Sequence, residues 1–105
     1  MSNITRQENE IIITGAIDSS SDLLTTLHQC IKEDGYKDLI LDLSECTKIL
    51  PHSMLPVCAK IIAYRSFDGV SIELIPPKDE KTCKSLKSTN LAYYIDPQQF
   101  DKSKF

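Results

Sequence analysis

The sequence lacks long segments of any single character. Its longest apolar runs are far shorter than the ~20 residues that a helix needs to span a bilayer. No Lys/Arg run exceeds two residues, and the formal net charge is −3. Since nucleic-acid-binding domains are usually basic, we expect no nucleic-acid partner. The first ten residues are polar and do not resemble a signal peptide, so we expect a cytoplasmic protein without direct membrane insertion.

Motifs for catalysis are also missing. The chain has no Gly-x-Ser-x-Gly elbow and no Gly-rich phosphate loop, and no acidic pair follows the first long strand. His52 and Ser53 adjoin, with Asp42 and Ser44 nearby in sequence, but adjacent side chains rarely point at each other as a Ser-His-Asp site requires. We therefore expect no enzymatic activity and no cofactor.

Close cysteine pairs are absent as well. The four cysteines are Cys30, Cys46, Cys58 and Cys83, and none belongs to a Cys-x-x-Cys pair. In a reducing compartment such cysteines are usually buried free thiols. A zinc site would need them to be gathered with His28 or His52 by the fold alone, whereas structural zinc sites usually have paired close ligands. We expect four reduced cysteines and no metal.

What remains is an ordinary globular composition in which strands and helices alternate. The 105 residues, 41% of them hydrophobic, suit a single domain over residues 1–105, with a core over about 10–96 and a polar tail over 97–105. Apolar and β-branched runs predict strands at Ile4–Gln7, Ile11–Thr14, Asp38–Leu43, Val70–Ile75 and Leu91–Ile95. Helical spacing predicts helices over about 21–33, Met54–Arg65 and Asp79–Ser88.

This order of elements predicts an α/β fold. We expect a mixed, mostly parallel sheet of four to five strands, packed against three or more helices. The continuous apolar centre of Asp38–Leu43 is typical of a strand that is covered on both faces. The sequence therefore predicts that Asp38–Leu43 is central, with Val70–Ile75 beside it.

Two prolines constrain the start of the second helix. If Pro51 were the first helical residue, Pro56 would lie in the helix interior, at a cost of about 3 kcal/mol. If Ser53 caps the helix instead, Pro56 occupies a position whose backbone N–H has no intrahelical partner anyway. Serine is also a preferred cap, worth about 1 kcal/mol. The second arrangement costs less, so we expect an extended loop over residues 50–52 and a helix that opens at Ser53.

This placement gives Ser53 two interpretations. It lies at the positive end of a helix, beyond the carboxyl end of the central strand, where ligand sites in open α/β sheets tend to lie. That position suits an anion, including a phosphate on the serine itself. The alternative is that Ser53 only caps the helix.

At these residues the chain resembles a STAS domain, the fold named for sulfate transporters and anti-sigma factor antagonists. The resemblance covers about residues 10–96. Its motifs are Gly15-Ala16-Ile17-Asp18, Asp42-Leu43-Ser44-Glu45-Cys46-Thr47, Leu86 and Asn90-Leu91, with Asn90 in place of the family's turn glycine. Asparagine tolerates the left-handed conformation that such a turn requires.

The family's regulatory loop has an Asp-Ser-Ser-Gly-like sequence, and the chain departs from it. The corresponding candidate partner-binding or phosphorylation loop is Leu50, Pro51, His52, Ser53 and Met54. The Asp and Gly are replaced, and the family's phosphorylated serine falls on Pro51 or His52. The chain therefore resembles a divergent branch without the Asp-Ser phosphorylation motif, some of whose members are linked to histidine-kinase-type ATPases.

The resemblance implies a regulatory protein-binding module similar to an anti-sigma factor antagonist. It would act through the second helix and the loop before it on a serine-kinase-like anti-sigma factor or an ATPase. The alternative is a non-catalytic cytoplasmic STAS subunit of a membrane transport complex, where phosphorylation is not needed. Either function is compatible with a homodimer.

Overall fold

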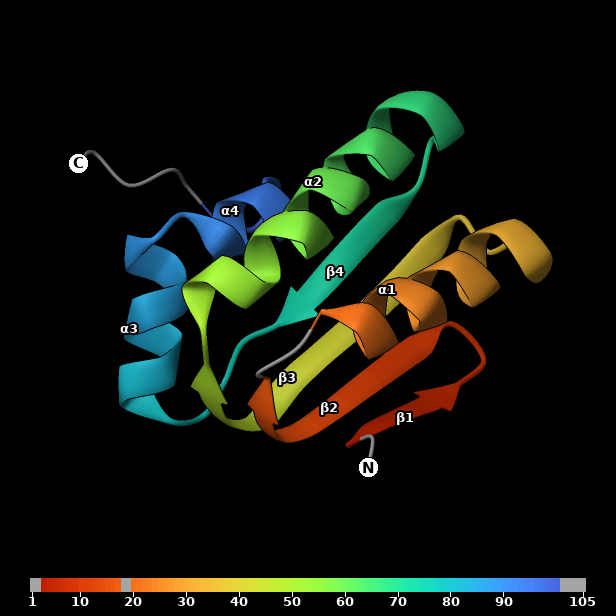
Figure 1. Ribbon diagram of the computed structural model, residues 1–105. Helices are drawn as coiled ribbons and strands as arrows, with labels where there is room; N and C mark the ends of the chain where they lie inside the picture. Colours follow the sequence, from red (N-terminus) through yellow and green to blue (C-terminus); the bar gives the residue numbers. More distant parts are fainter. Residues whose placement is uncertain (1–2, 18–19, 101–105) are drawn as a thin grey trace.

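The chain forms one sheet and a layer of helices (Figure 1). The computed structural model describes residues 3–17 and 20–100. The strands are β1 (Ile4–Gln7), β2 (Glu10–Ile17), β3 (Asp38–Ile49) and β4 (Ser71–Ile75). The helices are α1 (Ser21–His28), continued by a π-helical turn over Gln29–Glu33, then α2 (Pro51–Asp68), α3 (Glu80–Ser88) and α4 (Leu91–Ile95).

The sheet has the order β1-β2-β3-β4. The hairpin pair β1 and β2 is antiparallel, and β3 runs parallel to both β2 and β4. The prediction of an α/β fold with a mixed, mostly parallel sheet is therefore confirmed. The prediction that Asp38–Leu43 lies inside the sheet, beside the strand predicted at Val70–Ile75, is also confirmed.

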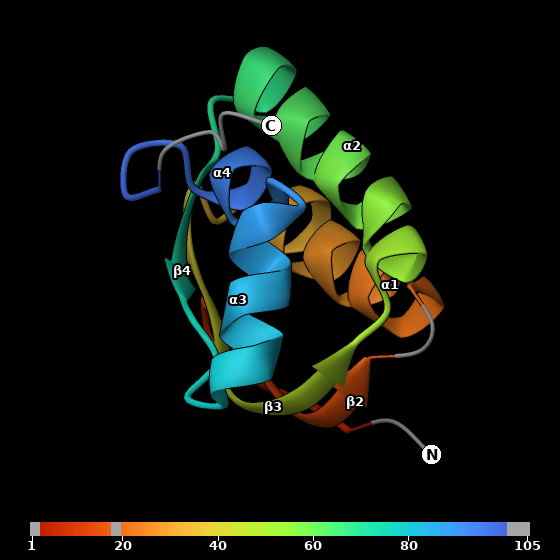
Figure 2. The same ribbon diagram turned by 90° about the vertical axis from the view of Figure 1, so that its left-hand side faces the viewer.

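In the described part of the chain the helices cover only one face of the sheet, and the prediction that β3 is covered on both faces is wrong. Figure 2 shows the curved sheet with the helices gathered on one side of it. Along β3, Leu39 and Leu41 are buried, whereas Ile40 between them is half-buried. A continuous apolar run can therefore belong to a strand with one open face, provided that the inward residues fill the core.

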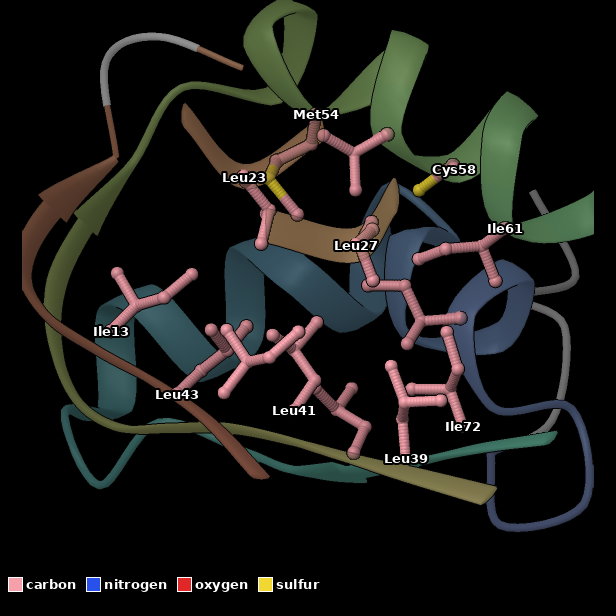
Figure 3. Close-up of a cluster of buried hydrophobic side chains, with 14 of the residues drawn as sticks. Ile13, Leu23, Leu27, Leu39, Leu41, Leu43, Met54, Cys58, Ile61 and Ile72 are labelled. Atoms are coloured by element: carbon pink, nitrogen blue, oxygen red, sulfur yellow. The ribbon is translucent and has the colours of Figure 1, made fainter. Parts of the chain in front are cut away.

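The core lies between this sheet face and the helices α1 and α2. The side chains that point into it include Leu39, Leu41 and Leu43 of β3, Leu23 and Leu27 of α1, and Met54, Cys58 and Ile61 of α2 (Figure 3). All eight are at most 2% exposed. Burying a side chain of this size contributes about 1.5–3 kcal/mol, so this layer supplies much of the stability of the fold.

The end of β3 and the class of Leu91–Ile95 differ from those predicted. Strand β3 continues to Ile49 because it stays paired with β2 well past Leu43, in a register interrupted by shifts. Leu91–Ile95, predicted as a strand, is the short helix α4. Asn90 adopts the left-handed conformation predicted for it, with φ of 66°, and this turn separates α3 from α4.

The residues after α4 protect the edge of β4. Asp96 is 7% exposed, and its carboxylate accepts a hydrogen bond from the Leu74 backbone N–H at 3.1 Å. The Gln99 side chain donates to the Leu74 carbonyl at 2.8 Å and to the Asp96 carboxylate at 2.9 Å. Phe100 packs partly against the core. These contacts satisfy the backbone N–H and carbonyl of Leu74 at the outer edge of β4. Without them, this part of the edge would be open to pairing with another strand.

Within the described residues, no helix combines the length and the apolar character needed to cross a bilayer.

We predict that Asp96→Ala lowers the free energy of unfolding by about 1–3 kcal/mol, because it leaves the buried Leu74 N–H without an acceptor. Urea denaturation measures this. Gln98→Ala, at an exposed position two residues further on, is the control and should change little. Equal losses from the two variants would show that the Asp96 carboxylate does not hold the edge of β4.

Candidate partner-binding face

The five residues predicted as a binding loop form the start of α2 instead. Leu50 is the N-cap residue, with extended backbone (φ −88°, ψ 114°) and no side-chain cap, and Pro51 is the first helical residue. His52 is exposed, Ser53 is half-buried and Met54 is fully buried. The prediction that Ser53 caps the helix is therefore wrong. Ser53 lies within the first turn, where its backbone N–H donates to the Leu50 carbonyl at 3.0 Å.

The length of β3 explains this earlier start. Strand β3 pairs with β2 as far as Ile49, opposite Ile17, and the Leu50 N–H donates to the Ile17 carbonyl at 3.2 Å. A single residue therefore separates strand from helix, and no room remains for an extended loop. Proline suits the first helical position because its fixed φ matches the helix and its missing N–H would have no partner there.

The early start places Pro56 inside the helix. Pro56 is the sixth residue of α2 counted from Pro51, and without an N–H it cannot donate to the His52 carbonyl. This costs about 3 kcal/mol. Met54 and Val57 are both fully buried, and each contributes about 1.5–3 kcal/mol. The burial of these two side chains outweighs the local cost, so core packing rather than capping sets where the helix begins.

The opposite side of α2 is apolar and faces solvent. Three large side chains are exposed there: Leu55 (59%), Ile62 (39%) and Phe67 (86%). The outer face of α2 consists of the exposed residues His52, Leu55, Pro56, Ala59, Lys60, Ile62, Ser66 and Phe67. A helix that is apolar on both sides is normally buried on both sides, so this face has the composition of a contact surface.

The charged side chains of α2 contribute little to its outer face. Arg65 donates to the backbone carbonyls of Tyr94 and Ile95 at 2.9 and 2.8 Å, which ties α2 to α4. Asp68 forms an ion pair with Lys32 at 2.7 Å, and the hydrogen bond from Lys32 lowers the pKa of the Asp68 carboxyl. Lys60 is the only Lys, Arg, Asp or Glu among the eight outer-face residues. The outer face is therefore nearly uncharged.

Asp42, His52 and Ser53, which the sequence analysis considered as a Ser-His-Asp site, do not come together. Asp42 alternates with the inward Leu41 and Leu43, so it lies on the open side of the sheet, where its carboxylate accepts from the Ser44 N–H at 2.9 Å. His52 and Ser53 lie in α2, on the helix side. The sheet thus separates the Asp42 carboxylate from both.

The cysteines lie in separate places. Cys30, Cys46 and Cys58 are buried and Cys83 is half-buried. Burial, with a smaller effect of the Asp42 charge, raises the pKa of the Cys46 thiol to about 12, and burial raises that of Cys58 to about 11. Such thiols are unreactive at neutral pH. The part of the chain that the structure describes holds no group of three or more His, Cys, Asp or Glu side chains suited to a metal ion.

No protein-family model matches this chain, and no curated protein matches its sequence. The local geometry therefore carries the functional interpretation. Sequence reasoning found α2 but missed its outer face, because helical spacing alone did not separate the exposed Leu55 and Ile62 from the buried Cys58 and Ile61. The signal was present: Leu55, Ala59 and Ile62 recur at helical spacing as a second stripe, next to that of Met54, Cys58 and Ile61.

We predict that Pro56→Ala raises the free energy of unfolding by about 1–3 kcal/mol, because alanine restores the backbone donor to the His52 carbonyl. Urea denaturation measures the change. Pro97→Ala, outside any helix, controls for the greater freedom of the unfolded chain when a proline is lost. An unchanged or lower stability for Pro56→Ala would place the helix start after Ser53, as the sequence alone suggested.

Proposed function

We propose that this protein is a cytoplasmic regulatory module that binds a protein partner through the outer face of α2 and the start of that helix at residues 50–54. The single observation that carries the proposal is the exposure of Leu55, Ile62 and Phe67 on one nearly uncharged helix face. The resemblance to STAS domains supports the same helix as the contact surface. It also suggests the partner class, a kinase-like anti-sigma factor or an ATPase.

The energetics of the face suit such a contact. Fully burying a side chain such as Leu55, Ile62 or Phe67 contributes about 1.5–3 kcal/mol, before the entropy lost on association is subtracted. The small residues Ala59 and Ala63 between them let another element approach the helix closely. A few large apolar side chains around a close contact are the usual arrangement of an interface hot spot.

The position of Ser53 favours a contact that needs no phosphorylation. Ser53 is half-buried within the first turn of α2, rather than displayed on an extended loop where a kinase would reach it. This observation favours the second candidate function, a non-catalytic STAS subunit of a membrane transport complex. Both candidates use the same outer face of α2, and they differ in the partner.

We predict that the double variant Leu55→Asp with Phe67→Asp loses its partner. The tagged chain is crosslinked in the cell that expresses it, the partner is identified by mass spectrometry, and binding is then measured with both proteins purified. Each substitution places a carboxylate where an apolar contact forms, so each should cost about 2 kcal/mol or more of binding free energy. Neither position belongs to the core, so the variant should stay folded.

The control is Gln29→Asp with Ser88→Asp, which adds the same charge at two exposed positions on other helices. It should bind like the original chain.

Capture of a kinase-like or ATPase protein supports the first candidate, and capture of a transporter component supports the second. Sedimentation of the purified chain shows whether the partner is a second copy. Unchanged binding by the Leu55/Phe67 variant would show that the contact surface lies outside the outer face of α2.

A further inference from the structure

A second unpartnered surface lies on the opposite side of the molecule, where no helix covers the sheet within the described residues (Figure 2). Strand alternation and register define it, because the inward residues Ile11, Leu41 and Leu74 alternate with outward ones. The name open sheet face is used for its outward residues on β2, β3 and β4 before the first register shift: Glu10, Ile12, Asp38, Ile40, Asp42, Ser71, Glu73 and Ile75. It uses none of the residues of the outer face of α2.

The register arranges these residues as a checkerboard. In one row Glu10, Ile40 and Glu73 are cross-strand neighbours on β2, β3 and β4. In the next row Ile12, Asp42 and Ile75 are neighbours in the same way. All three isoleucines are half-buried by their neighbours yet still reach solvent. Each apolar side chain is thus flanked by carboxylates.

The charge of this face has one sign. Four of its eight residues are acidic, namely Glu10, Asp38, Asp42 and Glu73, and none is basic. Arg6 and Lys48 are the only basic residues in the four strands. Arg6 forms its ion pair with Asp34, after the first helix, and Lys48 lies near the far end of β3. Nothing within the face itself neutralises its carboxylates.

The charge decides between the possible occupants. A second copy of this face, a nucleic acid and an anionic membrane would all meet like charge across the contact. A basic surface would be attracted, and the three isoleucines provide apolar contacts beneath it. Parallel strands are normally covered on both faces, and helices are what cover them. We infer that the open sheet face binds an amphipathic helix of a partner protein, with an apolar stripe flanked by Lys or Arg.

This second interface is independent of the one proposed on α2. The outer face of α2 is turned away from the sheet, and the open sheet face is turned away from the helices. The two surfaces therefore lie on opposite sides of the molecule (Figure 2). Both can be occupied at once, and the domain can then join two proteins. A substitution on one surface leaves the other unchanged, so either proposal can fail without the other.

The test uses two synthetic amphipathic helices of about 18 residues, long enough to cross the sheet at about 1.5 Å per residue. Both carry a leucine stripe, one flanked by lysines and the other by glutamates. The lysine peptide should bind the original chain, weaken as salt is raised, and shift the NMR amide signals of β2, β3 and β4. The glutamate peptide should not bind.

Charge reversal should exchange these preferences. Glu10→Lys with Glu73→Lys should weaken the lysine peptide by about tenfold or more, since close charge pairs across interfaces couple by at least that order. The same variant should gain binding of the glutamate peptide, which also shows that it is folded. Glu33→Lys with Glu80→Lys makes the same change in net charge at exposed helical positions and should behave like the original chain.

Three results would overturn the inference. The lysine peptide fails to bind the original chain, its NMR shifts map to α2, or the Glu33/Glu80 control loses as much affinity as the Glu10/Glu73 variant. The last result would mean that net charge alone attracts the peptide.

Discussion

The burial of one face of β3 beneath the helix layer of α1 and α2 is the contact on which the rest of the structure depends. Leu39, Leu41 and Leu43 are at most 2% exposed, and they pack in the layer that receives Met54 and Ile61 from the helix. This contact fixes which side of α2 points inward, and therefore which side is left for a partner. Because β2 and β4 align with β3, it also fixes which face of the sheet stays open.

The parts of the fold with a clear sequence period could be predicted. Alternation marked β4, a continuous apolar run marked β3, and helical spacing marked α1 and α3. Asp79 begins α3 as its N-cap, with its carboxylate accepting from the Thr82 N–H at 3.0 Å. Leu91–Ile95 was assigned to the wrong class because five residues containing two tyrosines and an isoleucine also suit a strand. The left-handed turn at Asn90 starts a new helix there.

The candidate site was predicted only in part, because local rules compete with packing. The two prolines and Ser53 favoured a later helix start, and that choice avoids an interior proline at about 3 kcal/mol. The register of β3 against β2 leaves one residue before α2, and the buried Met54 and Val57 outweigh the proline. Neither the register nor the burial can be read from residues 50–56 alone. The outer face of α2 could be read from the helical spacing once its inner face is known.

The proposed binding role of α2 requires that one apolar side packs into the core while the other stays available to a partner. Ile61 and Ile62 test this most directly, because they are adjacent in sequence and are 1% and 39% exposed. Ile61→Ala should lower the free energy of unfolding by about 2–5 kcal/mol, because it leaves a cavity in the core. Ile62→Ala should lower it by less than about 1 kcal/mol, since a surface position adds little to stability. Urea denaturation of the two variants gives both values, and equal losses would contradict the account by making Ile62 part of the core.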